Sequence, residues 1–363
     1  MKAAVLNEQP GALSIEDITV DAPGANEVLV RVVGAGLCHS DLHFMEGTFR
    51  TPLPSVLGHE SAGVVEAVGS DVTYCKPGDH VICCLSVFCG QCRQCLSGHP
   101  YRCMNPDATS RPKAGPARLR RSDGSAVDQF ARLGGFAEMM LVHQNAVVVI
   151  TKDMPLDRAA LIGCGVTTGL GAVFRTARVE PGARVCVIGA GGIGLAAIQG
   201  ARIAGAGQIV VVDVSDEKLE VAGRLGGTDL INASSVENVV AAVKALTDGG
   251  VDYSFEAIGL KATAEQAFNM LDIGGTATVI GMVPPRQTLD IRGIDLLSEK
   301  KLQGSMMGSN QFRTDMPMFI RMYLDGRLKL DEMVSGRLHL GEINEGYEAM
   351  KRGEVTRQVI IFD

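Results

Sequence analysis

The densest cluster of possible metal ligands in the sequence is the run C-x2-C-x2-C-x7-C, formed by Cys89, Cys92, Cys95 and Cys103. Four thiolates this close together can surround one zinc ion tetrahedrally and leave no position open, as a structural zinc site requires. Disulfides are the alternative, but such spacing is typical of small secreted proteins. This chain has 363 residues, ten scattered cysteines and no apolar signal segment after its first residues. We therefore predict a structural zinc lobe over 86–106.

Three further residues, Cys38, His59 and Cys164, could hold a second metal ion. Each alone would most often be ordinary, because a buried cysteine behaves as a small apolar residue and a lone histidine is commonly structural. Together they offer two sulfurs and one nitrogen, the three-ligand set that leaves a fourth position of zinc open for water or substrate. The spacing by itself does not show that the three converge.

A nucleotide-binding motif follows the apolar run A-R-V-C-V-I at 183–188, which predicts a strand buried on both faces. The run leads into a glycine loop and then a helix, an order that makes G-x-G-x-x-G a strong signal. Gly189 permits the tight turn, Gly191 lets the backbone approach a pyrophosphate, and Gly194 lets the helix pack on the strand. Gly192 and Ile193 complete the loop, where the helix N-terminus would face the phosphates.

Asp213 ends the second predicted strand, 208–213, nineteen residues after Gly194. A carboxylate there would accept hydrogen bonds from both hydroxyls of an adenosine ribose and would repel a 2'-phosphate, which selects NAD over NADP. The alternative is that Asp213 is only a turn residue at a strand end.

Further strands are expected at 252–256, at 277–280 and around Leu302, and helices at 216–225, 237–246 and 262–271. Alternating strands and helices predict a parallel, doubly wound sheet. The length and the 46% hydrophobic content favour two domains. The net charge of -7 gives no general attraction to nucleic acid or an anionic membrane, and no stretch approaches the roughly 20 apolar residues of a membrane span. We expect a cytoplasmic protein.

These motifs together resemble the zinc-dependent alcohol dehydrogenases of the medium-chain dehydrogenase/reductase superfamily, over essentially the whole chain. The matching residues are G-L-C-H-S-D-L-H at 36–43, G-H-E at 58–60, the four-cysteine lobe, G-C-G-V-T-T-G at 163–169, the glycine loop, Asp213 and G-E-V-T-R at 353–357. The resemblance implies an α/β protein. A GroES-like, β-rich catalytic domain would span 1–165 and be completed by 306–363, and a Rossmann domain for NAD would span 166–305.

The resemblance also implies roles for single residues. Catalytic zinc would be held by Cys38, His59 and Cys164, with Glu60 as an acid that ligates transiently and Asp41 orienting His59. Contacts to the cofactor would come, beyond the glycine loop and Asp213, from His39, Thr168, Lys218, Val283 and Arg357. Two zinc ions and one NAD per subunit are expected.

A proton must leave the substrate before hydride can, since an alcohol is a weak acid at neutral pH. Zinc supplies acidity, as it does for bound water. Ser40, beside Cys38, can accept the proton, and His43 could receive it through the nicotinamide ribose. The alternative is that His43 is a solvated surface residue.

The substrate pocket departs from that of the glutathione-dependent formaldehyde dehydrogenases, which is the alternative function. Those enzymes bind the glutathione adduct with a carboxylate and an arginine, and the matching positions here are Phe49 and Asp107. Phe49, Leu85, Phe130 and Val283 instead suggest an apolar pocket for medium-length or aromatic primary alcohols. An enzyme that keeps NAD bound, a non-catalytic relative, and a metal-storage or nucleic-acid-binding role for the lobe are further alternatives.

The stretch 104–132 reads as an insertion that dimeric members keep and compact tetrameric members lack. A homodimer is therefore expected, with a tetramer as the alternative. Pairing would join two nucleotide sheets through the edge strand near 301–305.

Overall fold

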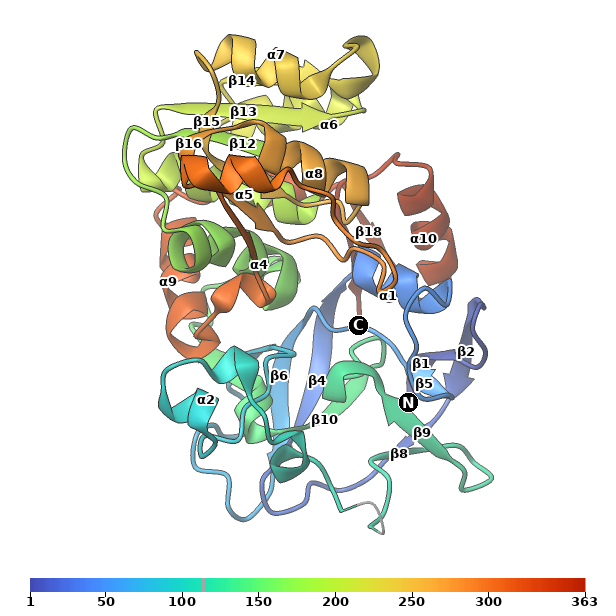
Figure 1. The fold of residues 1–363 in the computed structure, drawn as a ribbon. Helices are drawn as coiled ribbons and strands as arrows, with labels where there is room; N and C mark the ends of the chain where they lie inside the picture. Colours follow the sequence, from blue (N-terminus) through green and yellow to red (C-terminus); the bar gives the residue numbers. More distant parts are fainter. Residues whose placement is uncertain (113–114, 363) are drawn as a thin grey trace. The chain divides into compact units, whose positions relative to one another are not determined.

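A computed structural model describes residues 1–112 and 115–362 (Figure 1). Residues 113 and 114, part of the predicted insertion, lie outside the described residues. The chain divides into two compact units. The first contains Met1–Cys164, Gln311–Gly326 and Val334–Asp363, and the second contains Gly165–Asn310 and Arg327–Met333.

Two sheets form the framework of the first unit. One has the order β2-β1-β5-β9-β8-β3, the other the order β11-β7-β6-β4-β19-β18, and β10 also pairs with β4. Their strands are β1 (Lys2–Leu6), β2 (Leu13–Asp17), β3 (Thr19–Val20), β4 (Glu27–Gly36), β5 (Ser55–Val56), β6 (Ser61–Val68), β7 (His80–Cys83), β8 (Leu119–Arg120), β9 (Ala126–Gln129), β10 (Met139–His143), β11 (Val147–Ile150), β18 (Gly336–Leu338) and β19 (Gln358–Ile361).

The helices of the first unit are few and mostly short. They are α1 (His39–Met45), α2 (Arg93–Leu96), α3 (Leu156–Leu161), α9 (Phe312–Leu324) and α10 (Ile343–Lys351). Because α1 begins directly after the long strand β4, the loop at Leu37 and Cys38 lies at the end of the sheet.

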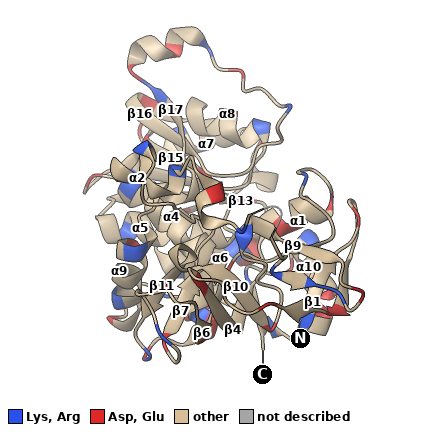
Figure 2. Cartoon of the chain, turned by 90° about the horizontal axis from the view of Figure 1, so that it is seen from below, with Lys and Arg blue, Asp and Glu red and all other residues tan. Residues whose placement is uncertain are grey.

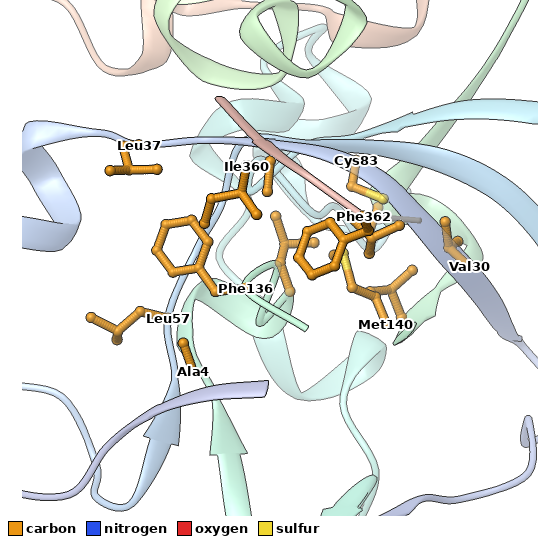
Figure 3. Packing of buried hydrophobic residues seen from close by; sticks show 14 of the residues in the cluster. Ala4, Val30, Leu37, Leu57, Cys83, Phe136, Met140, Ile360 and Phe362 are labelled. Carbon is orange, nitrogen blue, oxygen red and sulfur yellow. The ribbon is translucent and has the colours of Figure 1, made fainter. Parts of the chain in front are cut away.

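An apolar core packs between the strands of the first unit (Figure 3). Phe136 and Phe362 lie at the centre of the view, and Phe136 is fully buried. The core also includes Ala4 from β1 and Ile360 from β19, so both ends of the sequence contribute to it. This rigid base positions the loops between the strands, where the candidate site lies.

The second unit is built on one parallel sheet of order β14-β13-β12-β15-β16-β17. Its strands are β12 (Arg184–Ile188), β13 (Gln208–Asp213), β14 (Asp229–Asn232), β15 (Val251–Glu256), β16 (Leu271–Val279) and β17 (Lys301–Gly304), and its helices are α4 (Thr167–Gly171), α5 (Gly192–Ala204), α6 (Asp216–Leu225), α7 (Val239–Leu246) and α8 (Lys261–Asn269). The strand order reverses at β12 and β15, so right-handed crossovers place helices on both faces. The predicted doubly wound Rossmann sheet is confirmed.

Some element limits differ from the sequence predictions. The helix expected at 262–271 ends at Asn269, because Leu271 already pairs with Val251 as the first residue of β16. The strand β14 was not predicted, because its mixed residues D-L-I-N lack a long apolar run. The helix expected from 237 begins at Val239, where the side chain of Asn238 accepts a hydrogen bond from Ala241 N.

Basic and acidic residues are interspersed along the chain (Figure 2). One helical stretch, Leu156–Ala177, is apolar and long enough to cross a membrane, but 83% of its most apolar part is buried in the folded chain. Such burial is typical of a core helix in a globular protein.

Candidate metal centres and nucleotide site

The first candidate centre brings together Cys38, His59, Glu60 and Cys164. All four side chains are buried, and one ligand atom from each lies within 4.8 Å of the others. Cys38 precedes α1, and His59 and Glu60 lie directly before β6. Cys164 lies in a π-helical turn, Ile162–Val166, a local distortion that is frequent at functional sites.

Two glycines make this convergence possible. A Cβ on Gly36 would collide with the Glu60 carboxylate, and Gly36 N also donates to Glu60 O at 2.8 Å. Gly58 has φ +89, and a Cβ there would lie 2.6 Å from Phe136 N. Only glycine combines a positive φ with the absence of a Cβ, and Gly58 needs both. The motif G-H-E therefore reflects backbone geometry as well as chemistry.

Asp41 lies behind His59, as the sequence analysis proposed. Its Oδ1 accepts a hydrogen bond from Gly58 N at 3.0 Å and lies 3.1 Å from His59 Nδ1. With Nδ1 as the donor, the Nε2 atom of His59 is left as the ligand. Burial lowers the pKa of His59, but the charges of Asp41 and Cys38 outweigh burial and raise it well above its usual value. The same negative charges would favour a metal cation.

The two thiols of the centre are coupled. A hydrogen bond from Cys164 holds the pKa of Cys38 well below its usual value although burial opposes this, and the same bond raises the pKa of Cys164 well above its usual value. The two sulfurs lie close enough for one divalent cation to stabilise both as thiolates. Two sulfurs, an imidazole and a nearby carboxylate fit zinc with one open position.

Glu60 forms an ion pair with Arg357 that the sequence analysis did not anticipate. Arg357 Nη2 lies 2.6 Å from Glu60 Oε1, and Nη1 donates to Leu37 O at 2.9 Å. Burial raises the pKa of Glu60 to about 8, although Arg357 lowers it. The predicted role of Arg357 toward the cofactor pyrophosphate stays a prediction, as does that of His39.

A row of rings, which we call the aromatic row, begins at His59. Phe130 lies 5.7 Å from His59 between ring centroids, Phe44 lies 4.5 Å from Phe130, and Phe49 lies 5.9 Å from Phe44. His43 follows at 6.0 Å from Phe49. The predicted site residues include Phe49, Phe130 and His43 but not Phe44, since nothing in the spacing of Phe44 distinguishes it from a core residue of α1.

The remaining predicted residues of the first unit lie in different surroundings. Ser40 Oγ lies 3.6 Å from Cys38 Sγ, the neighbourhood expected for a proton acceptor. Leu85 is half buried and packs on the apolar core. Asp107 is exposed, in the short turn Pro106–Thr109.

The second candidate centre is the lobe of Cys89, Cys92, Cys95 and Cys103. Three of its sulfur–sulfur distances are 3.5, 3.9 and 4.0 Å, and sulfurs at zinc–sulfur distance around a tetrahedral ion lie about 3.8 Å apart. Backbone N–H groups point at the sulfurs, as from Cys92 N to Cys89 Sγ at 3.3 Å. Several hydrogen bonds lower the pKa of Cys92 to about 6, and the largest effect comes from the one that Met104 N donates. The donor set fits a closed zinc site.

The glycine loop of the second unit has the shape that a pyrophosphate needs. Gly189 has φ +97, nothing lies within 4 Å of a Cβ added at Gly191, and a Cβ on Gly194 would collide with Gly189 O. The three glycines thus make the turn, leave open space, and allow close packing. Gly192 and Ile193 start α5, whose N-terminus lies at the reversal of the strand order.

Asp213 braces the glycine loop. Its Oδ2 accepts from Ala190 N at 2.7 Å, and its Oδ1 accepts from Val214 N and Ser215 N at 2.8 and 3.0 Å. Lys218 lies in the first turn of α6, close behind it. Thr168 is buried and donates to Met307 Sδ at 3.5 Å, and Val283 is half buried after β16.

Comparison with known proteins decides the family. Residues 24–152 match the alcohol dehydrogenase GroES-like domain, and residues 192–321 match the zinc-binding dehydrogenase family. An S-(hydroxymethyl)glutathione dehydrogenase of Paracoccus denitrificans is 37% identical over 99% of both chains. The chain belongs to the zinc-dependent alcohol dehydrogenase family. It is an oxidoreductase of that family, as its resemblance in sequence predicted.

Solved structures of the family have the same fold. An alcohol dehydrogenase zinc-binding domain protein of Burkholderia ambifaria is 35% identical, with a TM-score of 0.94 and coverage of 100% of this chain and 98% of that one. Benzyl alcohol dehydrogenase of Acinetobacter calcoaceticus is 33% identical, with a TM-score of 0.92 and coverage of 100% and 99%.

Proposed function

We propose that the protein is an NAD-dependent dehydrogenase that interconverts primary alcohols and aldehydes, with aromatic alcohols preferred over ethanol. The observation that carries this proposal is the aromatic row that starts at His59, one of the candidate zinc ligands. Ring faces and edges favour an aromatic group by offset or edge-to-face contact. The likeness to a benzyl alcohol dehydrogenase supports it.

The chemistry needs a deprotonated substrate. Zinc held by Cys38, His59 and Cys164 would supply the acidity that an alcohol lacks. Ser40, next to Cys38, is placed to accept the proton, and His43 is proposed to pass it to water. Asp41 holds His59 in one tautomer, and Arg357 keeps the Glu60 carboxylate partly neutralised beside the sulfurs.

The cofactor assignment rests on the second unit. The loop at 189–194 and Asp213 fit the pyrophosphate and adenosine ribose of NAD, and Lys218, Thr168 and Val283 are proposed to line the same site. In domain terms, 1–165 with 306–363 would supply catalysis and 166–305 would bind NAD. A cytoplasmic homodimer is proposed.

A panel of alcohols tests the proposal. The purified protein should reduce NAD when benzyl alcohol or a medium-chain primary alcohol is added. The kcat/KM for these alcohols should be about tenfold or more above that for ethanol, which corresponds to about 1.4 kcal/mol in transition-state binding. Chelation should abolish the signal and added zinc should restore it. Activity only with an artificial electron acceptor would show that NAD stays bound, and no activity with any alcohol would contradict the proposal.

Glutathione-dependent formaldehyde oxidation is the second candidate, because the Paracoccus denitrificans relative carries that name. Two positions argue against it. Phe49 belongs to the aromatic row, and Asp107 is an exposed acid, so neither offers a cation or a polar anchor suited to the adduct. Formaldehyde oxidation should therefore be poor and unchanged by glutathione, and strong activation by glutathione would favour this second function.

A further inference from the structure

Arg132 lies in a strained turn between β9 and β10. Ala131 and Arg132 have φ values of +54 and +63, which residues other than glycine rarely adopt. Leu133 N and Gly134 N both donate to Phe130 O, at 2.9 and 3.1 Å, and close the turn. Strain of this kind persists only where the surrounding contacts hold it, and it concentrates at functional sites.

The guanidinium of Arg132 binds the chain on both sides of the four cysteines. Its Nη1 donates to Thr109 Oγ1 at 2.9 Å and its Nη2 donates to Val87 O at 3.3 Å. Val87 precedes the first cysteine of the lobe by two residues, and Thr109 follows the last cysteine by six. One side chain therefore joins the two segments where the chain enters and leaves the lobe.

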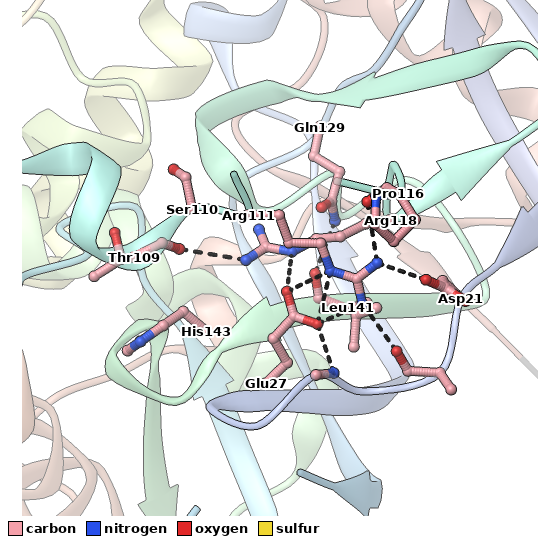
Figure 4. Close-up of polar contacts among 12 residues, drawn as sticks. Asp21, Glu27, Thr109, Ser110, Arg111, Pro116, Arg118, Gln129, Leu141 and His143 are labelled. Carbon is pink, nitrogen blue, oxygen red and sulfur yellow. Dashed lines mark hydrogen bonds and ion pairs between the residues drawn. The ribbon is translucent and has the colours of Figure 1, made fainter. Parts of the chain in front are cut away.

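The charge of Arg132 also fits this place. Among the described residues, no carboxylate pairs with it, whereas the nearby Arg111 and Arg118 both bind Glu27 (Figure 4). Burial and Arg118 lower the pKa of Arg132, and the negative charge of Cys103 opposes them. A zinc ion held by four thiolates carries net negative charge, because four thiolates outweigh a divalent cation. Such a centre would balance a guanidinium that lacks a carboxylate partner.

The other end of the turn reaches the first centre. The ring of Phe130, two residues before Arg132, lies 5.7 Å from the ring of His59 and 4.5 Å from that of Phe44. One residue separates Phe130 from Arg132, and the bonds from Leu133 N and Gly134 N to Phe130 O tie the two ends of the turn together. A displacement of Arg132 would therefore shift the backbone that carries the Phe130 ring.

We propose that Arg132 is a positioning residue that ties the structural zinc lobe to Phe130, so that an intact lobe sets the aromatic specificity of the catalytic site. The specificity part rests on the proposed function, and the link between Arg132 and the lobe does not. Outer contacts to metal sites commonly change metal affinity by about 10- to 100-fold when they are lost.

Arg132→Met tests this, because methionine keeps much of the length and the same backbone preference while removing the charge and the donors. We expect zinc release from the lobe to a chromogenic chelator to become about tenfold faster. The KM for benzyl alcohol should rise about tenfold and that for 1-butanol by less than about threefold, with kcat for 1-butanol unchanged. Arg132→Lys should restore part of both effects.

Three further variants sharpen the test. Arg120→Met removes a neighbouring arginine that binds neither end of the lobe and should leave both measurements as in the wild type. Thr109→Val removes the Oγ1 atom that accepts from Arg132 Nη1, together with its own bond to Pro106 O, and leaves Arg132 in place. It should repeat the faster zinc release, even if Arg132→Met fails to fold. Adding Arg132→Met to Phe130→Ala should not raise the KM for benzyl alcohol further.

Different outcomes would contradict the link between Arg132 and the lobe and the effect of that link on specificity. Unchanged zinc release in both Arg132→Met and Thr109→Val would overturn the proposal, whatever the activity. Faster release with an unchanged ratio of the two KM values would also overturn it, since the lobe would then not act through Phe130. A wild-type protein that oxidises no alcohol would contradict the proposed function, and the zinc measurements would still judge the link to the lobe.

Discussion

At the scale of single residues, the charge of the candidate catalytic centre depends on neighbours that are not themselves ligands. Glu60 is fully buried and its carboxylate is next to two thiols, yet the guanidinium of Arg357 lies 2.6 Å away. Asp41 is likewise buried behind His59. A buried charge is tolerated only when it is paired. The contact of Arg357 with Glu60 and that of Asp41 with His59 therefore allow the buried ligands to hold a cation without an unpaired carboxylate beside it.

His43 offers a test of proton transfer, because it is not one of the four candidate ligands and its ring lies beside that of Phe49, at 6.0 Å between centroids. His43→Gln should lower alcohol oxidation near neutral pH by roughly ten- to a thousandfold, within or somewhat below the usual contribution of a general base. The loss should shrink as pH rises, since hydroxide can then take the proton. Steady-state rates across pH check this, and an unchanged pH profile would show that His43 is only a surface residue.

Asp213 offers a test of cofactor choice. Asp213→Gly removes the proposed ribose acceptor and its repulsion of a 2'-phosphate, so the preference for NAD over NADP should fall by one or more orders of magnitude, each about 1.4 kcal/mol. Because Asp213 also accepts from Ala190 N at 2.7 Å, affinity for both cofactors should fall somewhat. Binding titrations with both cofactors measure the ratio, and a wild-type preference for NADP would contradict the assignment.

At the scale of elements, Glu27 fixes the start of β4 to the loop that follows the four-cysteine lobe. Its Oε2 lies 2.6 Å from Arg111 Nη2 and its Oε1 lies 2.7 Å from Arg118 Nε, and Arg111 also binds Asp21 (Figure 4). Burial would raise the pKa of Glu27, but the two arginines and Gly24 N together lower it below the ordinary value near 4.5. Its stabilising effect is therefore present above about pH 4.5 and is lost as pH falls through the lowered pKa.

Glu27→Gln should lower the free energy of unfolding by about 3 kcal/mol at neutral pH, because it leaves the largely buried Arg118 without its carboxylate partner and leaves Arg111 with Asp21 alone. The gap between wild type and variant should narrow on acidification below pH 4.5. Glu66→Gln, which breaks the exposed pair with Arg31, is the control and should cost less than about 1 kcal/mol. Denaturant unfolding at several pH values measures both, and a gap that is constant with pH would contradict the assignment.

The two zinc centres differ in the elements that carry them, and this predicts different losses. Cys95→Ser should lower the melting temperature first, since a closed site contributes folding energy. Cys164→Ser should remove the catalytic ion and activity while leaving a folded protein, because Cys164 lies in a buried helical turn surrounded by apolar core residues such as Leu161 and Val166. Zinc analysis with thermal melts separates the two, and one zinc per chain in fully active protein would contradict the two-site assignment.

The sequence predicted the parts of this architecture that repeat a local pattern. The apolar run before Gly189 and the alternation after it were enough for the parallel sheet, and strict cysteine spacing was enough for the lobe. Contacts between residues far apart in the sequence could not be predicted. Arg357 and Glu60 are 297 residues apart, and no period links Phe44 to Phe130. The clash that excludes a Cβ at Gly36 likewise exists only once Glu60 is in place.

At the scale of the whole molecule, the sheet of the second unit ends in a strand suited to pairing. β17 is the last strand in the order, and its outer edge therefore presents backbone donors and acceptors. The segment just before it exposes large apolar side chains, with Ile294 65% and Leu297 80% exposed, and Met306 just after it is 59% exposed. An isologous pair through this edge would bury these side chains and extend the sheet across a two-fold axis.

If the proposed homodimer pairs through β17, Leu297→Asp should shift it toward monomer, because an unpaired charge in an apolar interface costs several kcal/mol. Ile273→Asp is the matched control, since Ile273 is 77% exposed near the start of β16 and is not expected in the interface. Sedimentation velocity over a range of concentrations should show a weaker dimer only for the first variant. Equal dissociation of both, or a wild-type monomer, would contradict pairing through β17. A tetramer that Leu297→Asp reduces to dimers would show that this edge forms one of two interfaces.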